Sequence, residues 1–378
     1  MLRSVLPLVY LLCVRALRCL DNDGGEVDWW FMYKLPNGYR FAYNDQYSGD
    51  AASPLLMYGR SMDNETHPVA ITRTLQALAE KPLRSTTPNS YYLYNDEPYG
   101  GVASPTYGHT KGVVAASADG DGGLWILHST PHWPASTGKA KFYFPESEIT
   151  FGQTFLCMSL DRGELDAVGL QQMLTRPYVY HKTGLFTKAY STVAAVYPNL
   201  AEVLAGHWEK NPGTRTQLLN VGKATQTFTA LAKNKEWAND LWGNLVAPHY
   251  RSGFIVESWM RGQALGPYCP PDHPNVIVDA RTLYVDDGGQ NLTWKETQDH
   301  AKWGVALDSS YVLCVGDLNR MESQRNRGGG AVCFSDRKLA YGLYRTIMNS
   351  DRCNSSQAQK AQKARWAATK GSYNSTSM

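Results

Sequence analysis

The chain has 378 residues, a formal net charge of +3, and 43 % hydrophobic against 19 % charged residues. This composition is typical of a globular protein and excludes a disordered chain. Because the single long apolar run lies at the N-terminus, a protein with several membrane spans is also excluded. The small net charge excludes a chain held on nucleic acid by charge alone, although nine histidines would raise the charge in an acidic compartment.

The N-terminus has the three parts of a secretory signal peptide. A short basic start precedes the apolar stretch Ser4–Val14, which is too short to cross a bilayer, and small residues allow cleavage after Ala16. The alternative is a signal anchor. Cleavage removes Arg3 and Arg15 and leaves a net charge of +1. We therefore predict a secretory-pathway protein with a signal peptide over residues 1–16.

The cysteines and sequons agree with secretion. Cys13 leaves with the signal peptide, and the six remaining cysteines predict three disulfides, for which fifteen pairings exist. They are Cys19, Cys157, Cys269, Cys314, Cys333 and Cys353. The chain has no C-x-x-C pair, so we expect no structural zinc site. The candidate glycosylation sites are Asn64, Asn291, Asn354 and Asn374.

Strands and helices alternate along the rest of the chain, which favours an α/β fold. Apolar alternation and turn residues predict strands over 27–34, 39–43, 91–94, 112–116, 124–127, 154–158, 253–259 and 276–278, with a further hairpin in 299–320. Helical periodicity predicts helices over 69–80, 164–175, 198–209, 223–239 and 338–348. The basic tail over 355–378 is expected to be solvated and partly helical.

The most informative pattern is a repeated H-x-K motif. His109 and Lys111 form the first copy, and His300 and Lys302 form the second, 191 residues later. Each copy opens an apolar run, and residues i and i+2 of a strand share a face, so each motif is expected to present an imidazole beside an ammonium group. If the two halves pack about a pseudo-twofold axis, all four side chains meet in one cleft.

Two imidazoles and two ammonium groups suit phosphodiester cleavage without a metal or another cofactor. One imidazole can attack phosphorus, and the other can protonate the leaving oxygen and later activate water. The lysines can hold the non-bridging oxygens. The alternative, that the histidines are structural and the repeat arises by chance, has equal weight from spacing alone.

Three further residues follow the motifs at hairpin distance. Ser129 lies eighteen residues after Lys111, and Asn319 lies seventeen residues after Lys302, with Asp317 beside it. A hydroxyl or amide there can contact the phosphate or orient an imidazole. For Asp317 and Asn319, a role in turn formation is the alternative.

The sequence resembles the deoxyribonuclease II family, which shares the phospholipase D-like arrangement. The resemblance is carried by eight ordered segments: VDWWFMYKLP (27–36), YLYNDEP (92–98), GHTKGV (108–113), DGGLWILHSTPHWP (121–134), FGQTFLC (151–157), DHAKW (299–303), CVGDLNR (314–320) and RGGG (327–330). It implies a sandwich of two pseudo-symmetric α/β halves with mixed sheets, over 17–160 and 161–354. It also implies the disulfides Cys19–Cys157, Cys269–Cys353 and Cys314–Cys333.

The resemblance further implies an acid endonuclease that acts on DNA without divalent metal and leaves 3′-phosphate ends. It places the enzyme in the lysosome or outside the cell, acting on engulfed, apoptotic or ingested DNA. The matching catalytic residues are His109, Lys111, His300 and Lys302. We expect largely sequence-independent DNA binding and no stable membrane association, and the arrangement would tolerate a homodimer. The rivals are a phospholipase D-like phosphodiesterase and a silent secreted DNA-binding protein.

Other polar and aromatic residues have weaker predictions. The phospholipase D aspartate has no counterpart, because positions 116 and 307 are alanine and leucine, and Asp119 and Asp121 are expected in a turn. His128 is expected to be structural or to support the site rather than to bind metal with His132. Most tryptophans are expected in the core. Four cations near the second hairpin are a candidate DNA contact, with a solvated loop as the alternative: Arg320, Arg325, Arg327 and Lys338.

Overall fold

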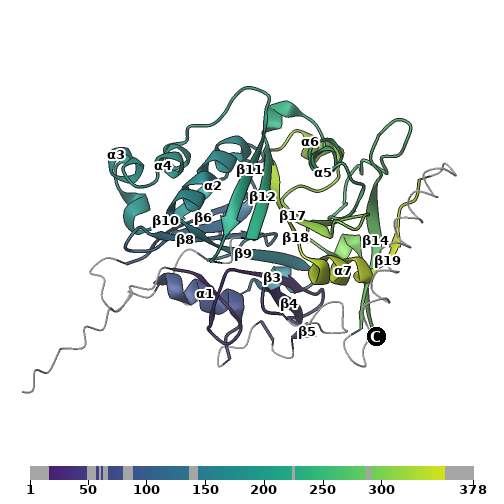
Figure 1. Ribbon diagram of the computed structural model, residues 1–378, viewed down its shortest axis with the longest axis horizontal. Coiled ribbons are helices and arrows are strands. Elements are labelled where there is room, and N and C mark those ends of the chain that lie inside the picture. The colour runs from purple at the N-terminus through teal and green to yellow at the C-terminus, as the bar shows by residue number, and fades with distance from the viewer. Residues whose placement is uncertain are drawn as a thin grey trace, which may run out of the picture.

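The computed structural model describes residues 17–48, 57–58, 61–62, 67–79, 88–135, 144–223, 226–286 and 291–353. The expected signal peptide and basic tail, and the sequons at Asn64, Asn354 and Asn374, lie outside these residues. Two large β-sheets pack face to face, and helices cover their outer faces and ends (Figure 1). The protein is therefore an α/β sandwich. None of the described helices has the length and apolar character needed to cross a membrane.

The first sheet has eight strands in the order β10-β6-β7-β8-β9-β3-β4-β5. Every neighbouring pair in it is antiparallel, whereas mixed sheets were expected. The strands are β3 (Trp29–Lys34), β4 (Phe41–Asp45), β5 (Met57–Tyr58), β6 (Ser90–Asn95), β7 (Lys111–Ala116), β8 (Gly122–His128), β9 (Gln153–Asp161) and β10 (Val179–Lys182). A small separate sheet joins β1 (Cys19–Leu20) to β2 (Glu26–Val27).

The second sheet has the order β11-β12-β18-β17-β16-β13-β14-β15, with β19 paired to β14. It is mixed, because β13 and β14 run parallel. Its strands are β11 (Thr214–Val221), β12 (Gln226–Lys233), β13 (Phe254–Glu257), β14 (Ile277–Asp286), β15 (Asn291–Lys295), β16 (Trp303–Ala306), β17 (Val312–Gly316), β18 (Gly329–Ser335) and β19 (Ile347–Ser350). The predicted hairpin in 299–320 is formed by β16 and β17.

Both faces of the first sheet are buried. Along β3, successive side chains point alternately into two different hydrophobic cores. Trp29, Phe31 and Tyr33 enter the core between the two sheets, whereas Trp30 and Met32 face the outer core, which α1 (Ala70–Ala79) covers. The period of two along a strand makes this division possible. The other longer helices are α2 (Arg162–Thr175), α4 (Pro198–Ala205) and α7 (Arg337–Thr346). The shorter helical segments are α3 (Tyr190–Ala194), α5 (Ala247–Tyr250), α6 (Glu322–Arg325), η2 (Glu146–Glu148), η3 (Gly184–Thr187), η4 (Lys235–Trp237), η5 (Trp242–Val246) and η6 (Glu296–Gln298).

One predicted helix is wrong. Residues 226–233 form β12 instead of the middle of a helix over 223–239. The run QTFTALAK has alanine and lysine, which favour helices, but Phe228 and Ala230 enter the core between the sheets. Leu231 lies on the opposite face, against the outer core of the second sheet. Pairing with β11 and β18 on both edges outweighs the weak helix propensity.

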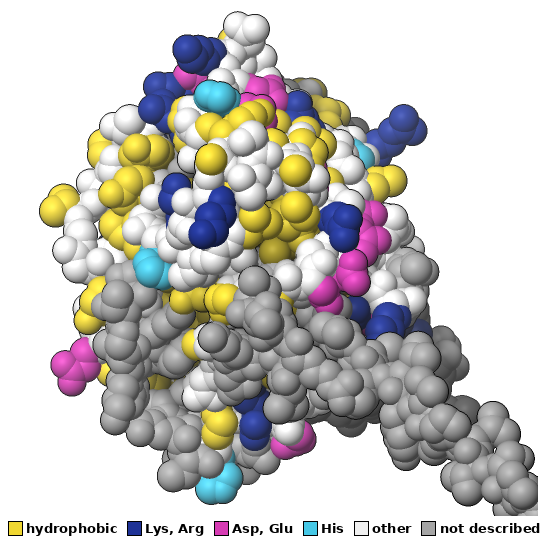
Figure 2. Space-filling model, turned by 90° about the vertical axis from the view of Figure 1, so that its left-hand side faces the viewer, with side chains coloured by type: hydrophobic (Ala, Val, Ile, Leu, Met, Phe, Trp, Pro, Cys, Tyr) yellow, Lys and Arg dark blue, Asp and Glu magenta, His cyan; other side chains and the backbone are white. Residues whose placement is uncertain are grey.

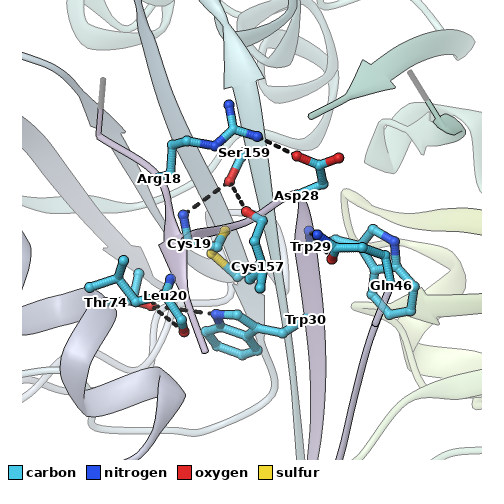
Figure 3. Close-up of a disulfide and its surroundings, with 11 residues drawn as sticks. Arg18, Cys19, Leu20, Asp28, Trp29, Trp30, Gln46, Thr74, Cys157 and Ser159 are labelled. Atoms are coloured by element: carbon cyan, nitrogen blue, oxygen red, sulfur yellow. Dashed lines mark hydrogen bonds and ion pairs between the residues drawn. A yellow bond between two sulfur atoms is a disulfide. The ribbon is translucent and has the colours of Figure 1, made fainter. Parts of the chain in front are cut away.

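The structure has the three disulfides that the resemblance implies: Cys19–Cys157, Cys269–Cys353 and Cys314–Cys333. The first ties the N-terminal strand β1 to β9, and Ser159 beside it accepts a hydrogen bond from the Cys19 amide at 3.0 Å (Figure 3). In the same region Arg18 forms an ion pair with Asp28. These contacts anchor the start of the described chain to the centre of the first sheet.

Candidate active site

His109 lies in the loop two residues before β7, rather than inside the strand as the i, i+2 argument assumed. Its backbone amide donates to the Gly328 carbonyl at 2.8 Å, and its Nδ1 lies 2.9 Å from the Asp317 carbonyl oxygen. Both partners come from the second half of the chain. A carbonyl oxygen can only accept, so Nδ1 carries the proton and Nε2 keeps its lone pair in the neutral ring.

Lys111, the first residue of β7, is buried against an acidic partner. Its Nζ lies 2.5 Å from Oδ1 of Asp96, and Arg327 meets Oδ2 of the same carboxylate at 2.8 Å. Burial opposes ionisation of Asp96, but Lys111, His109 and Arg327 outweigh it and hold the pKa of Asp96 well below its usual range. Asp96 therefore fixes two cations beside His109.

His300 lies three residues before β16 and is almost fully buried, with 6 % of its surface exposed. Its ring stacks on Phe151 with centroids 4.3 Å apart and planes 6° from parallel. The indole of Trp259 meets it edge-on at 4.1 Å. Its amide donates to the Gly152 carbonyl at 2.9 Å. The imidazole is therefore held on two sides by aromatic rings.

The Nδ1 atom of His300 faces polar groups from the first half of the chain. Oε2 of Glu148 lies 3.3 Å away and Nε2 of Gln153 lies 3.4 Å away. Ser129 donates to Oε1 of Gln153 at 2.5 Å. Nε2 of His300 is buried without a hydrogen-bond partner in the described structure. Ser129 therefore reaches the imidazole through Gln153, and Nε2 is the ring atom left for a ligand.

Electrostatic interactions connect the two motifs across the halves. Burial lowers the pKa of His109 well below 6.5, and Lys111 and Lys302 lower it further against the opposing effect of Asp96. Burial also lowers the pKa of His300 to about 4, against the hydrogen bond with Glu148. The pKa of Lys302 falls to about 8 because of burial and the charge of Lys111. The structure thus brings the four motif side chains into one electrostatic neighbourhood.

Asp317 and Asn319 follow β17, and Asp317 is the one that contacts a motif residue. The carboxylate of Asp317 accepts from the Gly330 amide at 2.9 Å, and burial raises its pKa to about 7. Oδ1 of Asn319 is buried and has no hydrogen-bond partner among the described groups. Asp317 therefore holds His109 through its backbone carbonyl, whereas its side chain supports the strand β18.

His128 and His132 have separate surroundings. His128 is buried, packs edge-on against Trp133 at 4.9 Å, and has a pKa lowered well below 6.5 by burial. Nδ1 of His132 contacts the Pro98 carbonyl at 3.3 Å. A different set within the described ranges has metal-ligand spacing, with ligand atoms of Asp96, Glu97 and His109 within 4.8 Å of one another. A metal there would have to displace Lys111 and Arg327 from Asp96.

The predicted basic cluster is not one surface. Arg320 is fully buried and forms ion pairs with Asp279 at 2.7 Å and with Asp240 at 3.4 Å. The prediction that Arg320 contacts DNA is therefore wrong. A buried charge needs such partners because desolvation is costly. Arg325 pairs with Glu322. On the face that Figure 2 shows, the described lysine and arginine side chains are scattered rather than gathered in a continuous basic band.

The chain is similar to known nucleases along nearly its whole length. The family profile Deoxyribonuclease II matches residues 18–353. A putative deoxyribonuclease-2 of Burkholderia thailandensis is 34 % identical over 88 % of this chain and 92 % of that protein. Deoxyribonuclease-2 of Caenorhabditis elegans is 30 % identical over 89 % and 94 %, and deoxyribonuclease-2-alpha of Sus scrofa is 31 % identical over 85 % and 86 %. The chain belongs to the deoxyribonuclease II family, whose members are deoxyribonucleases of the hydrolase class.

Sequence reasoning missed the residues that surround the motifs. Asp96, Glu148, Gln153, Phe151 and Trp259 all contact a motif side chain, yet none was singled out as a site residue. Asp96 and Phe151 lie inside segments that carry the family resemblance. Glu148 ends the short helical segment η2, which has no recognisable sequence pattern. Only the packing of η2 near the segment before β16 brings its carboxylate to His300.

Proposed function

We propose that this DNA-degrading nuclease cleaves phosphodiester bonds without divalent metal, with His109 as nucleophile and His300 as general acid and base. The observation that carries the proposal is the shared arrangement of the two imidazoles. Each ring has Nδ1 engaged by protein, at the Asp317 carbonyl for His109 and at Glu148 for His300, and Nε2 of His300 is buried without a described hydrogen-bond partner. The charges of Lys111 and Lys302 lower the pKa of both imidazoles.

The first step forms a bond between Nε2 of His109 and phosphorus and breaks the bond from phosphorus to the 5′ oxygen. Protonated His300 donates its proton to that oxygen, so the leaving group departs as a hydroxyl. The 3′ side of the cut stays on His109 as a phosphohistidine. His300 then takes a proton from water, which attacks phosphorus and breaks the P–N bond. The product has a 3′-phosphate end, and both histidines return to their starting states.

The lysines and carboxylates support these steps electrostatically. Lys111 and Lys302 are placed to offset the charge that gathers on the non-bridging oxygens. Glu148 favours the protonated form of His300, which the first step consumes. Asp96 holds Lys111 in place at 2.5 Å. This set supplies acid, base, nucleophile and charge stabilisation from side chains alone.

The cellular setting forms part of the proposal. The signal peptide over 1–16, the three disulfides and the exposed Asn291 at the start of β15 favour a glycosylated protein of the lysosome or the extracellular space. Acid-dependent cleavage suits DNA of engulfed, apoptotic or ingested material. The division into phospholipase D-like halves over 17–160 and 161–354, the homodimer and the absence of stable membrane association remain predictions.

Cleavage of supercoiled plasmid at pH 5 in excess EDTA tests the proposal. We expect nicked and linear DNA, with 3′ ends that block polymerase extension until a phosphatase removes the phosphate. Loss of cleavage in EDTA, with recovery on adding magnesium, would contradict the metal-free route. Binding without cleavage would support the silent DNA-binding rival. Release of choline from phosphatidylcholine, with DNA left intact, would support the phospholipase rival.

A further inference from the structure

Two lysines outside the H-x-K motifs are fully buried, and the proposed reaction uses neither of them. Lys34 is the last residue of β3 and Lys233 is the last residue of β12, and both residues are 0 % exposed. Burying an ammonium group costs free energy unless hydrogen bonds replace its hydration. The hydrogen bonds that these two lysines make therefore indicate what they hold in place.

The ammonium group of Lys34 fastens the turn that leads into β9. It donates to the backbone carbonyls of Leu35 at 3.0 Å, Ile149 at 2.8 Å and Phe151 at 2.6 Å. The ring of Phe151 stacks on the imidazole of His300, and the next carbonyl along the chain, at Gly152, accepts from the His300 amide. Lys34 therefore fixes the backbone beside two contacts of His300.

Lys233 has corresponding partners in the second half of the chain. Its Nζ donates to the backbone carbonyls of Arg325 at 2.8 Å and Arg327 at 2.7 Å, in the segment that leads into β18. The next carbonyl, at Gly328, accepts from the His109 amide at 2.8 Å. Each buried lysine thus fixes a turn whose glycine receives a motif histidine from the other half of the chain.

The strand registers show that the two arrangements correspond. Lys34 lies opposite Gln153 on β9, and Lys233 lies opposite Gly329 on β18. In both pairs, the residue opposite the lysine directly follows the glycine whose carbonyl accepts from a histidine amide. The same device therefore occurs once in each large sheet, and each copy serves a different histidine.

Both turns are closely packed, so a shift in either one would reach its histidine. A Cβ at Gly152 would lie 2.3 Å from Oδ1 of Asp299, and a Cβ at Gly328 would lie 2.3 Å from the carbonyl oxygen of Thr175. Closely packed interiors transmit strain. Misplacing a reacting group by about 1 Å can cost roughly 10²-fold in rate.

We propose that Lys34 and Lys233 are positioning residues for the cleavage reaction, with Lys34 holding the turn that places His300 and Lys233 holding the turn that places His109. An ammonium group suits this task because it offers up to three donors from one point and accepts nothing. The role of the histidines in cleavage rests on the proposed function. The contacts of the two lysines do not depend on it.

Lys34 should also make the placement of His300 sensitive to pH. A protonated lysine has three N–H donors and a neutral amine has two, whereas Lys34 donates to three carbonyls. Burial lowers the pKa of Lys34 to about 7, against the opposing charges of Asp299 before β16 and Glu148 on η2. One carbonyl therefore loses its donor as pH rises through 7. The two hydrogen bonds of Lys233 can persist in its neutral form.

Site-resolved amide hydrogen exchange tests the proposal without requiring cleavage. The variants are Lys34→Met and Lys233→Met in the full chain, because methionine is similar in length and has no donor. At pH 5, Lys34→Met should lower the protection factor of the His300 amide about tenfold, as a local opening, and leave that of His109 within twofold. Lys233→Met should do the reverse. Equal losses at both amides, or no loss at either, would overturn the proposal.

Milder changes cover the case in which a methionine variant fails to fold. Lys34→Gln and Lys233→Gln keep a side-chain N–H group, and each should show the same selectivity with a smaller loss of protection. In the wild type, raising the pH from 5 to 8 should lower the protection factor of His300 more than that of His109, and a constant ratio would refute the pH sensitivity of Lys34. Lys188→Met is the matched control, because Lys188 is exposed after η3, and it should leave both amides within twofold.

Kinetics separate this proposal from the proposed function. Since neither lysine touches substrate, both methionine variants should lower kcat for plasmid cleavage roughly 10- to 100-fold and leave KM within twofold. Folded variants with wild-type kcat would refute the positioning role alone. Failure of the wild type to cleave in EDTA, together with the selective losses of amide protection, would refute the proposed function and leave the contacts of the two lysines established.

Discussion

Nδ1 of His109 lies 2.9 Å from the backbone carbonyl oxygen of Asp317, 208 residues further along the chain. An imidazole from the first half of the chain is thus oriented by a peptide group from the second. The hydrogen bond fixes the tautomer that leaves Nε2 unprotonated. The candidate nucleophile therefore exists in its reactive form only when both halves are folded together.

Replacing His300 with alanine should abolish cleavage and leave the fold intact. Loss of the acid and base should cost at least the ~10²–10⁴ of acid–base catalysis. His249→Ala is the matched control, because His249 is exposed on α5. Plasmid cleavage rates of both variants, with thermal unfolding to check folding, make the comparison. A folded His300→Ala protein with a rate near wild type would contradict the assignment.

Glu148→Gln should shift the alkaline limb of the rate profile to lower pH. The carboxylate of Glu148 favours the protonated form of His300, so its removal should move the pKa of His300 below about 4. The rate at pH 5 should fall, and the optimum should move to lower pH. A merely structural role for Glu148 would lower the rate equally at every pH. The measurement is kcat against pH for the wild type and the variant at constant ionic strength.

The wild-type profile should be bell-shaped, with its optimum on the acid side. The mechanism needs one neutral and one protonated imidazole, and burial together with the two lysines lowers the pKa of both histidines. A proton is therefore shared between them only in acid, and the bound phosphate should raise both pKa values. A rate–pH series in EDTA measures this. An optimum above pH 7 would show that the two-histidine route is wrong.

Asp317→Asn should change how stability depends on pH. The folded pKa of Asp317 is about 7 against 3.8 for the free side chain, so the folded state binds more protons between these values. Its contribution to stability is complete below pH 3.8 and is lost as pH rises through 7. At 1.4 kcal/mol per unit this reaches up to about 4 kcal/mol. Asparagine keeps an acceptor for Gly330, so urea unfolding from pH 4 to 8 should show a smaller loss for the variant.

Replacing Cys314 and Cys333 with serine should lower both stability and activity. The bridge closes a loop with a sequence separation of 19 residues, and loop entropy predicts a loss of about 3 kcal/mol. That loop contains Asp317 and Gly328, which hold His109. The matched control replaces Cys269 and Cys353 with serine. It should lower stability with less effect on activity. Non-reducing peptide mapping that links Cys314 to Cys269 or Cys353 would contradict the pairing.

The sequence by itself determined much of the local structure. Period-two alternation around the turn at 36–38 predicted β3 and β4, and the runs on both sides of 119–123 predicted β7 and β8. These predictions succeeded because a strand with buried faces needs apolar side chains at regular spacing. The paired H-x-K motifs could also be found in the sequence, because each motif occupies three consecutive residues. The ordered family segments indicated the family, which the profile match over 18–353 shows.

Only the tertiary structure decided what surrounds those motifs. Residues 226–233 became β12 because strands on both edges supplied partners that no local propensity reveals. Arg320 is a buried ion-pair residue because Asp279 reaches it from β14. Glu148 meets His300 across 152 positions, and Asp317 meets His109 across 208. Such contacts depend on how the two halves pack against each other. The free energy of that packing comes from the whole core, so no short segment of the sequence predicts it.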